Sequence, residues 1–298
     1  MTKQSTIIKV LSMLFIGTHI SLAVVVSGGD GTQNTTAPVG DQGWSYVGRI
    51  SNKPSSVTYV SNNWFITAHH IKQLDNPTAV ILNGTTYNID SSSWTRVTNV
   101  VSGTDADLEM FRVTTSVSDV SGTSIVSSRL SNGTDVTMIG NGYNREATET
   151  SWDRSWVEGG TPTRYRGYKW GSAFGTSKRW GSNTIEGSQS AVDDGYGVTD
   201  VLFTDFDNVD GEAQGATYDS GGGVFANNKL AGIMLFVGTY STNQPNYTAV
   251  YGNQTYMADL SSYSTQINNT IAIPEPAVIS IFLLIGGGVW FVRRIFVI

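Results

Sequence analysis

The chain has 298 residues, a formal net charge of −6 and no cysteine. The absence of cysteine excludes thiol nucleophiles, cysteine-ligated zinc, iron–sulfur clusters and disulfides. The acidic balance argues against a nucleic-acid-binding protein, which needs a basic surface. Only three histidines are present, at 19, 69 and 70, so any imidazole chemistry outside the N-terminal apolar run must involve His69 or His70.

The first residues of the chain have the pattern of an export signal. Lys3 and Lys9 precede an apolar run over residues 10–26, and small residues follow near its end. This order is typical of a cleavable secretory signal peptide; the alternative is a signal anchor that stays in the membrane. We expect residues 1–27 to be the signal peptide. The Gly-, Thr- and Asn-rich residues 28–42 are expected to be a flexible lead-in.

The middle of the chain predicts an all-β protein. Short β-prone runs, such as residues 57–60, 79–82 and 136–139, are separated by turn residues. Asn83-Gly84 between two such runs is a strong hairpin signal. Strands at such short intervals indicate a barrel or a sandwich, and the Ser- and Thr-rich stretch 114–128 is the expected connection between two halves.

One helix is predicted near the end of this region. Apolar residues recur at spacings of three and four over residues 257–271, which is the helical period. Thr255, just before them, is the expected N-cap.

Three segments carry residues suited to chemistry. A β-prone run from Trp64 ends in small residues and then His70, which places an imidazole at the end of a strand. Asp107 leads into an apolar strand, where a half-buried carboxylate needs a hydrogen-bonding partner. Ser220 is followed by three glycines, whose backbone freedom allows a tight turn that exposes N–H groups.

The three segments together resemble the trypsin/chymotrypsin-like serine protease family. Their order, His then Asp then Ser, is the chymotrypsin order. Residues 66–70 (ITAHH) resemble the family's V-T-A-A-H motif, residues 107–111 (DLEMF) resemble D-I-A-L-L, and residues 219–222 (DSGG) match the core of G-D-S-G-G-P. The resemblance implies a chymotrypsin-like double six-stranded β-barrel with a C-terminal helix. The first barrel is expected over 43–128 and the second barrel with the helix over 129–271.

The resemblance also implies the roles of individual residues. His70, Asp107 and Ser220 correspond to the catalytic triad of a serine endopeptidase, and the backbone N–H groups of Tyr218 and Ser220 correspond to its oxyanion hole. His70 is preferred to His69, and Asp107 to Asp105, because the neighbouring residues then fall in the family's register. The corresponding substrate pocket is formed by Gln214, Leu235, Phe236 and Val237. No metal or cofactor is expected, and the substrate is a protein or peptide.

Tyr218 and Asp219, next to Ser220, fit the family's pattern differently. Tyr218 stands where the family has glycine, which puts the oxyanion hole in question. Asp219 matches the aspartate that in the trypsin family pairs with a newly released N-terminus. Nothing near Trp44 resembles the family's I-V-G-G start, so its partner here stays open.

The C-terminus resembles a PEP-CTERM sorting signal of Gram-negative bacteria. Pro274-Glu275-Pro276 is followed by an apolar run and then by Arg293-Arg294. Residues 272–298 are therefore expected to be this signal, a transmembrane segment that holds the protein in the membrane before an exosortase-type enzyme processes it. The implied location is the cell envelope or the extracellular space; the alternative is a plain tail anchor.

Two other functions remain open at this stage. A protease-like domain that binds without catalysis, as an envelope protein, is favoured by Tyr218. An esterase or other serine hydrolase would use the same three residues on a different substrate.

Overall fold

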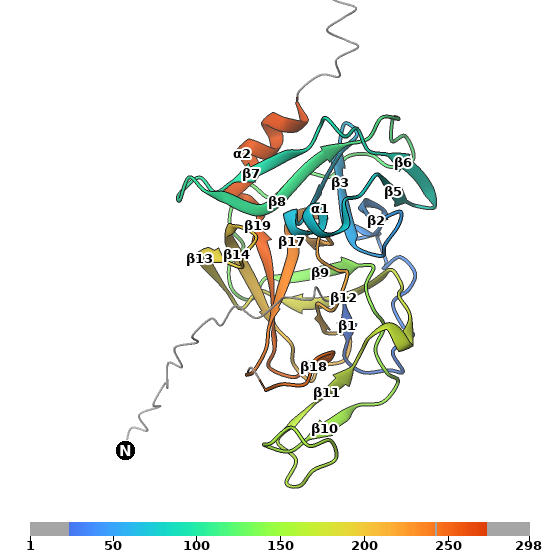
Figure 1. The fold of residues 1–298 in the computed structure, drawn as a ribbon, viewed down its shortest axis with the longest axis vertical. Helices are drawn as coiled ribbons and strands as arrows, with labels where there is room; N and C mark the ends of the chain where they lie inside the picture. The colour runs from blue at the N-terminus through green and yellow to red at the C-terminus, as the bar shows by residue number, and fades with distance from the viewer. Residues whose placement is uncertain (1–23, 242, 273–298) are drawn as a thin grey trace, which may run out of the picture.

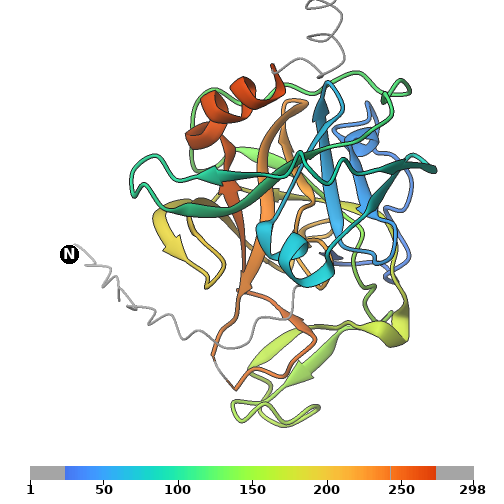
Figure 2. The ribbon, with the colours of Figure 1, turned by 45° about the horizontal axis from the view of Figure 1, so that its top comes forward.

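The structure is a computed structural model that describes residues 24–241 and 243–272. Most of the expected signal peptide and nearly all of the expected sorting signal lie outside these residues. Within the two described ranges, no helix is long and apolar enough to cross a membrane. Strands dominate the described residues, together with two α-helices that are labelled in Figure 1 and drawn in the same colours in Figure 2.

The first sheet is formed by the N-terminal half. Its strands lie in the order β6 (Thr85–Asn88), β5 (Ala79–Leu82), β2 (Val47–Ile50), β3 (Ser56–Ser61), β4 (Trp64–Thr67), β8 (Asp105–Arg112) and β7 (Thr95–Thr98). All of its pairings are antiparallel. The predicted hairpin is confirmed, since β5 and β6 are joined by Asn83 and Gly84 at φ 48° and 84°, as a two-residue turn with left-handed residues requires.

The second sheet is formed by the C-terminal half. Its strands lie in the order β12 (Arg179–Thr184), β9 (Asp135–Gly140), β16 (Gly223–Ala226), β17 (Lys229–Gly238), β19 (Gln254–Asp259), β14 (Val198–Asp205) and β13 (Gly187–Asp193). These pairings are also antiparallel. No strand forms between β8 and β9, so the connection between the halves covers residues 113–134.

Each sheet has seven strands where six were expected, and an interrupted strand explains the difference. β6 and β7 lie at opposite ends of the first sheet but are consecutive in the chain, and Ile89 between them bridges to Val113. In the second sheet β12 and β13 have the same relation, and Glu186 between them donates its N–H to the Phe203 carbonyl. If β6 and β7 are counted as one strand, and β12 and β13 as another, each sheet has six strands and its two ends are joined.

Smaller elements extend the second half. β10 (Thr150–Trp152), β11 (Tyr165–Lys169) and β18 (Thr248–Val250) form a three-stranded sheet that projects at the lower end of Figure 1. β1 (Val25–Val26) pairs with β15 (Ala213–Gln214). Two short 3₁₀ helices, Trp44–Tyr46 and Ser172–Phe174, complete the elements.

The segment before the first sheet differs from the expectation of a flexible lead-in. Val24, Val25 and Val26 are buried, although they fall within the expected signal peptide. The chain after them is held to the second half: Arg145 donates to the carbonyls of Val26 and Gly29 at 2.8 and 3.2 Å. Contacts with buried side chains therefore fix residues that composition alone marks as a linker.

The terminal helix begins later than predicted. α2 covers Leu260–Ile271, and Asp259 caps it by accepting the Ser261 N–H at 3.1 Å. Thr255, the predicted N-cap, lies in β19 instead. The prediction of the start was wrong because residues 254–259 pair with β14 and β17, and this pairing outweighs the local helical period.

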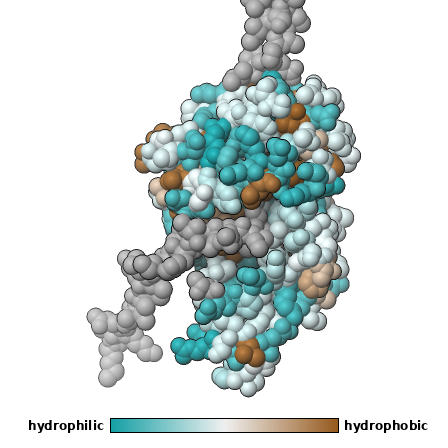
Figure 3. All heavy atoms as spheres, in the orientation of Figure 1, coloured by the Kyte–Doolittle hydropathy of each residue, from teal (hydrophilic) through white to brown (hydrophobic). Residues whose placement is uncertain are grey.

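The main core lies inside the first sheet and continues into the second. Aromatic rings stack at its centre: Phe65 lies 5.5 Å from Phe111, and Trp94 lies 4.5 Å from the same ring. Ile233 and Leu235 of β17 belong to the same cluster, so the two halves share apolar contacts. On the face shown in Figure 3, hydrophobic residues form only small separate patches between hydrophilic and neutral ones.

The central ring gives a stability prediction. Replacing Phe111, which is fully buried, with alanine leaves a cavity between two aromatic rings. We expect the free energy of unfolding to fall by about 3–5 kcal/mol, measured by urea denaturation. Val101→Ala, at a side chain that is 81% exposed, is the matched control. Equal effects of the two variants would contradict this core.

Candidate active site

His70 lies where β4 ends and α1 (His69–Asp75) begins. All four residues of β4 are buried, which anchors the strand, and Ala68 is extended before the helix turns. The imidazole is buried as well. The apolar strand therefore delivers His70 to a defined place between the two sheets.

His70 makes two hydrogen bonds to Asp107 on β8. Its Nδ1 lies 2.7 Å from Asp107 Oδ2, and its backbone N–H donates to Oδ1 at 2.9 Å. The two contacts fix both oxygens of the carboxylate relative to the ring. The neighbouring strands set this arrangement, since Thr67 of β4 pairs with Glu109 of β8.

Burial and charge act in opposite directions on this pair. Burial lowers the pKa of His70, but the charge of Asp107 and its hydrogen bond raise it by more, so the net pKa is raised. Burial raises the pKa of Asp107, whereas the charge of His70 and its hydrogen bonds lower it below its usual value. The result is an ionised carboxylate that stabilises a protonated imidazole.

The neighbouring histidine has a different partner. His69 Nδ1 lies 2.5 Å from the Glu109 carboxylate, which also accepts from Lys72 at 2.9 Å. Asp105 is exposed. His70 and Asp107, the residues preferred from the sequence, are thus the ones that contact each other.

Ser220 lies in the turn between β15 and β16, and side chains of the first sheet hold this turn. Thr58 donates to the Gly221 carbonyl at 3.0 Å. Gly221 has φ +87°, and a Cβ there would lie 2.1 Å from the Ser56 carbonyl oxygen, so only glycine fits at this contact. Ser220 Oγ donates to the Leu235 carbonyl at 2.9 Å.

The backbone around Ser220 offers two N–H groups. Neither the Tyr218 nor the Ser220 N–H donates a hydrogen bond to another residue within the described ranges. The Tyr218 carbonyl accepts from the Ser56 N–H at 2.9 Å and from its hydroxyl at 2.8 Å. Tyr218 has φ 80°, a conformation that residues other than glycine rarely adopt.

Asp219 lies in the same turn and is fully buried. Its Oδ1 accepts the Gly142 N–H at 3.1 Å, and its Oδ2 has no partner among the residues of the described ranges. Burial raises the pKa of this carboxyl well above its usual value, and the hydrogen bond from Gly142 and the charge of Arg179 oppose that effect only in part. No described side chain forms an ion pair with it.

The expected pocket residues are placed on two neighbouring segments. Gln214 is buried in β15, and a Cβ on the adjacent Gly215 would lie 3.5 Å from Val237 Cγ2 on β17. Phe236 stacks on Tyr256 at 4.7 Å. Leu235 is 2% exposed and packs in the main core, so it offers its carbonyl rather than its side chain to the site.

A second carboxyl lies next to Asp107, and the sequence did not reveal it. Asp194 is buried at the tip of the β13–β14 hairpin, with its carboxyl within hydrogen-bonding reach of the Asp107 carboxyl. Tyr196 of the same tip places its ring 5.1 Å from the His70 ring. Residues 193–197 (DDGYG) have the composition of an ordinary turn, and no motif in them indicates proximity to a histidine.

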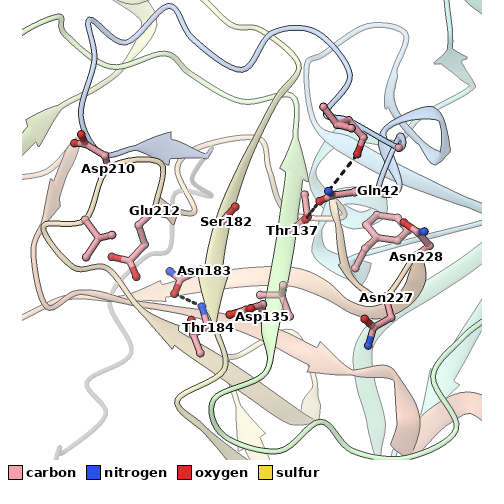
Figure 4. A pocket seen from close by; sticks show the side chains of 15 residues that line it. Gln42, Asp135, Thr137, Ser182, Asn183, Thr184, Asp210, Glu212, Asn227 and Asn228 are labelled. Atoms are coloured by element: carbon pink, nitrogen blue, oxygen red, sulfur yellow. Dashed lines mark hydrogen bonds between the residues drawn. The ribbon is translucent and has the colours of Figure 1, made fainter.

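A cavity of about 620 Å³ lies elsewhere, beside β9 and β12 (Figure 4). Its lining includes Asp135, Thr137 and Glu212 but none of His70, Asp107 and Ser220. Within residues 24–241 and 243–272, no three His, Asp or Glu side chains are arranged to hold a metal ion.

Comparison with solved structures identifies the fold. A mutant of human heparin binding protein superposes with a TM-score of 0.52 at 13% identity, over 82% of this chain and 97% of that chain. Mouse neuropsin, a serine protease, gives a TM-score of 0.48 at 12% identity, over 80% of this chain and 98% of that chain. Rv3671c from M. tuberculosis gives 0.46 at 12% identity, over 84% and 98%.

The chain thus has the chymotrypsin-like fold of the trypsin-like serine proteases, with a C-terminal helix, as predicted. No protein-family model matches the chain. A search of curated protein sequences gives no match either.

The His70–Asp107 contact predicts a change in titration. Asp107→Asn removes the charge that raises the pKa of His70, so we expect that pKa to fall. NMR of the imidazole nitrogens in the full chain measures it, with His69→Gln used for assignment. Asp105→Asn, which removes an equal charge two residues away at an exposed site, should leave the His70 titration unchanged; a shift of similar size in both variants would contradict the pairing.

Proposed function

We propose that the protein is a serine endopeptidase in which Ser220 is the nucleophile, His70 the general base and Asp107 the residue that orients His70. The observation that carries the proposal is the His70–Asp107 pair, joined by two hydrogen bonds, beside the turn that presents Ser220. Function on this fold has to be argued from the site, because folds host many activities.

The chemistry proceeds by acyl transfer. Ser220 Oγ attacks the carbonyl carbon of a peptide bond while His70 takes its proton, and the protonated imidazole then donates to the leaving amine. Asp107 stabilises the imidazolium, in keeping with the raised pKa of His70. Water then attacks the acyl-enzyme by the same route and releases the second product.

The N–H groups of Tyr218 and Ser220 form the oxyanion hole in this proposal. Tyr143 supports it, because its N–H donates to the Thr217 carbonyl at 3.0 Å and so holds the Thr217–Tyr218 peptide, which carries the Tyr218 N–H. Gln214 is neutral, so a strong preference for Arg or Lys substrates is not expected. The Ser220 hydroxyl must leave the Leu235 carbonyl to attack, a single rotation about its side-chain bond.

A second candidate function is binding without catalysis, as a protease-like envelope protein. Tyr218 in place of glycine and the bond from Ser220 to Leu235 favour it. One structurally similar protein is named a heparin binding protein. The net charge of −6 on this chain disfavours a polyanionic ligand.

We further propose that the protein is exported and reaches the envelope or the outside of a Gram-negative cell. The apolar N-terminal run and the Pro274-Glu275-Pro276 segment with its flanks support this proposal. Removal of a signal peptide and processing of the C-terminal signal by an exosortase-type enzyme are its two maturation steps.

Labelling of the full chain with a fluorophosphonate probe tests the nucleophile. We expect wild type to be labelled and Ser220→Ala and His70→Ala to lose labelling, because the probe reacts only with an activated serine. Ser128→Ala, at an exposed serine, and His69→Gln are the matched controls and should be labelled like wild type. Peptide and ester substrates then separate a peptidase from an esterase.

Tyr218→Gly separates the peptidase from the binding protein. Loss of one oxyanion donor costs about 10²–10³ in rate, so a badly oriented Tyr218 N–H would make wild type slow and the glycine variant faster by up to that factor. A correctly oriented Tyr218 N–H predicts little change in rate. If a folded wild type and this variant both resist labelling, the catalytic proposal is wrong.

A further inference from the structure

The carboxyl group of Asp194 lies beside the His70–Asp107 pair. It is 7% exposed. Its Oδ1 accepts the N–H groups of Tyr196 and Gly197 at 2.9 and 3.0 Å, and the carboxyl lies within hydrogen-bonding reach of the Asp107 carboxyl. The proposed mechanism gives it no role.

The hairpin that carries Asp194 is built to reach this position. A Cβ on Gly197 would lie 2.4 Å from the Asp107 backbone nitrogen, so the hairpin backbone touches β8 directly. Thr199 Oγ1 accepts the Asp107 N–H at 2.9 Å. Arg96 of β7 ties the two segments together by donating to the carbonyls of Ala106 and Tyr196.

Two adjacent buried carboxyls cannot both carry full charge at low cost. Asp107 is the one that stays ionised, because both of its oxygens accept from His70. Asp194 has no cation bonded to its carboxyl among the described side chains. It therefore holds the proton of the pair, and a protonated carboxyl is a hydrogen-bond donor.

We propose that Asp194 is a positioning residue that donates a hydrogen bond to Asp107 as a neutral acid and so extends the triad to a fourth, titratable member. This inference rests on the proposed function of His70, Asp107 and Ser220. The O–H of Asp194 donates to the Asp107 carboxylate, and the loss of its proton places a second negative charge near the imidazole.

The charges around the group support a transition close to neutrality. Burial and then the charge of Asp107 raise the pKa of Asp194 to about 7, and the charge of His70 opposes them. The Arg96 guanidinium is bonded to backbone carbonyls. Asp193 and Asp105, on the hairpin and on β8, are both exposed. Below pH 7 Asp194 is thus mainly a donor; above it, its charge adds to that of Asp107 and raises the pKa of His70.

Asp194→Asn and Asp194→Ala test the inference through the pH dependence of kcat/KM. Asparagine keeps a donor toward Asp107 without a charge, so we expect kcat near wild type and an acid limb that moves to lower pH as a single-proton step. Alanine removes the donor, so below pH 7, where Asp194 is protonated, loss of a hydrogen bond to a charged group predicts a fall in kcat of about tenfold or more. Rescue by asparagine distinguishes a hydrogen-bonding role from a merely structural one.

Asp193→Asn is the matched control, since it removes the same charge from the same hairpin at an exposed position. It should leave both kcat and the acid limb unchanged. An Asp194→Asn enzyme with the wild-type acid limb overturns the inference, and so does an alanine variant as active as wild type. If the alanine variant does not fold, the shift of the acid limb in the asparagine variant still tests the inference.

A titration without catalysis separates this inference from the proposed function. NMR of the His70 imidazole in full-length Ser220→Ala protein should show a lower midpoint when Asp194→Asn is added. If the His70 midpoint falls but wild type is not labelled by fluorophosphonate, the peptidase proposal is refuted and the Asp107–Asp194 pair is retained. If wild type is labelled but the His70 midpoint does not change, the Asp107–Asp194 pair is refuted and the peptidase proposal is retained.

Discussion

The contact between the Tyr218–Gly222 turn and the end of β3 is the constraint on which the site depends. The turn belongs to the second sheet, whereas His70 and Asp107 belong to the first. Bonds from Ser56 and Thr58 to carbonyls of the turn cross this boundary, and neither bond involves an ionisable group. These two links between the serine turn and the first sheet are therefore insensitive to pH.

The closed sheets explain why such weak contacts suffice. Each sheet returns to its first strand through an interrupted one, so its ends cannot fray independently. The shared core of Ile233 and Leu235 with the first sheet limits sliding of one half on the other. Because the chain has no cysteine, no disulfide adds to the packing and hydrogen bonding that stabilise the two sheets.

Sequence patterns predicted the features that local chemistry determines. Asn83-Gly84 fixes a hairpin through its own backbone preferences, and the apolar positions after Asp107 identify the strand β8, whose residues 106–111 are buried. The helix start was misplaced because residues 254–259 are hydrophobic at positions that suit a strand as well as a helix. Asp194 could not be predicted, since its proximity to Asp107 arises from a contact between β8 and β14 separated by about ninety residues.

If the protein is exported as proposed, the pairing of β1 with β15 makes the exact point of signal cleavage matter. Removal of residues 1–27 would take away the partner strand of Gln214 together with three buried valines. Burial of a valine contributes about 1.5–3 kcal/mol, so the shortened chain would lose support directly beneath the segment that leads to Ser220. A cut before Val24 would keep that support, and signal peptidase would then determine not only where the protein goes but how firmly its nucleophile turn is held.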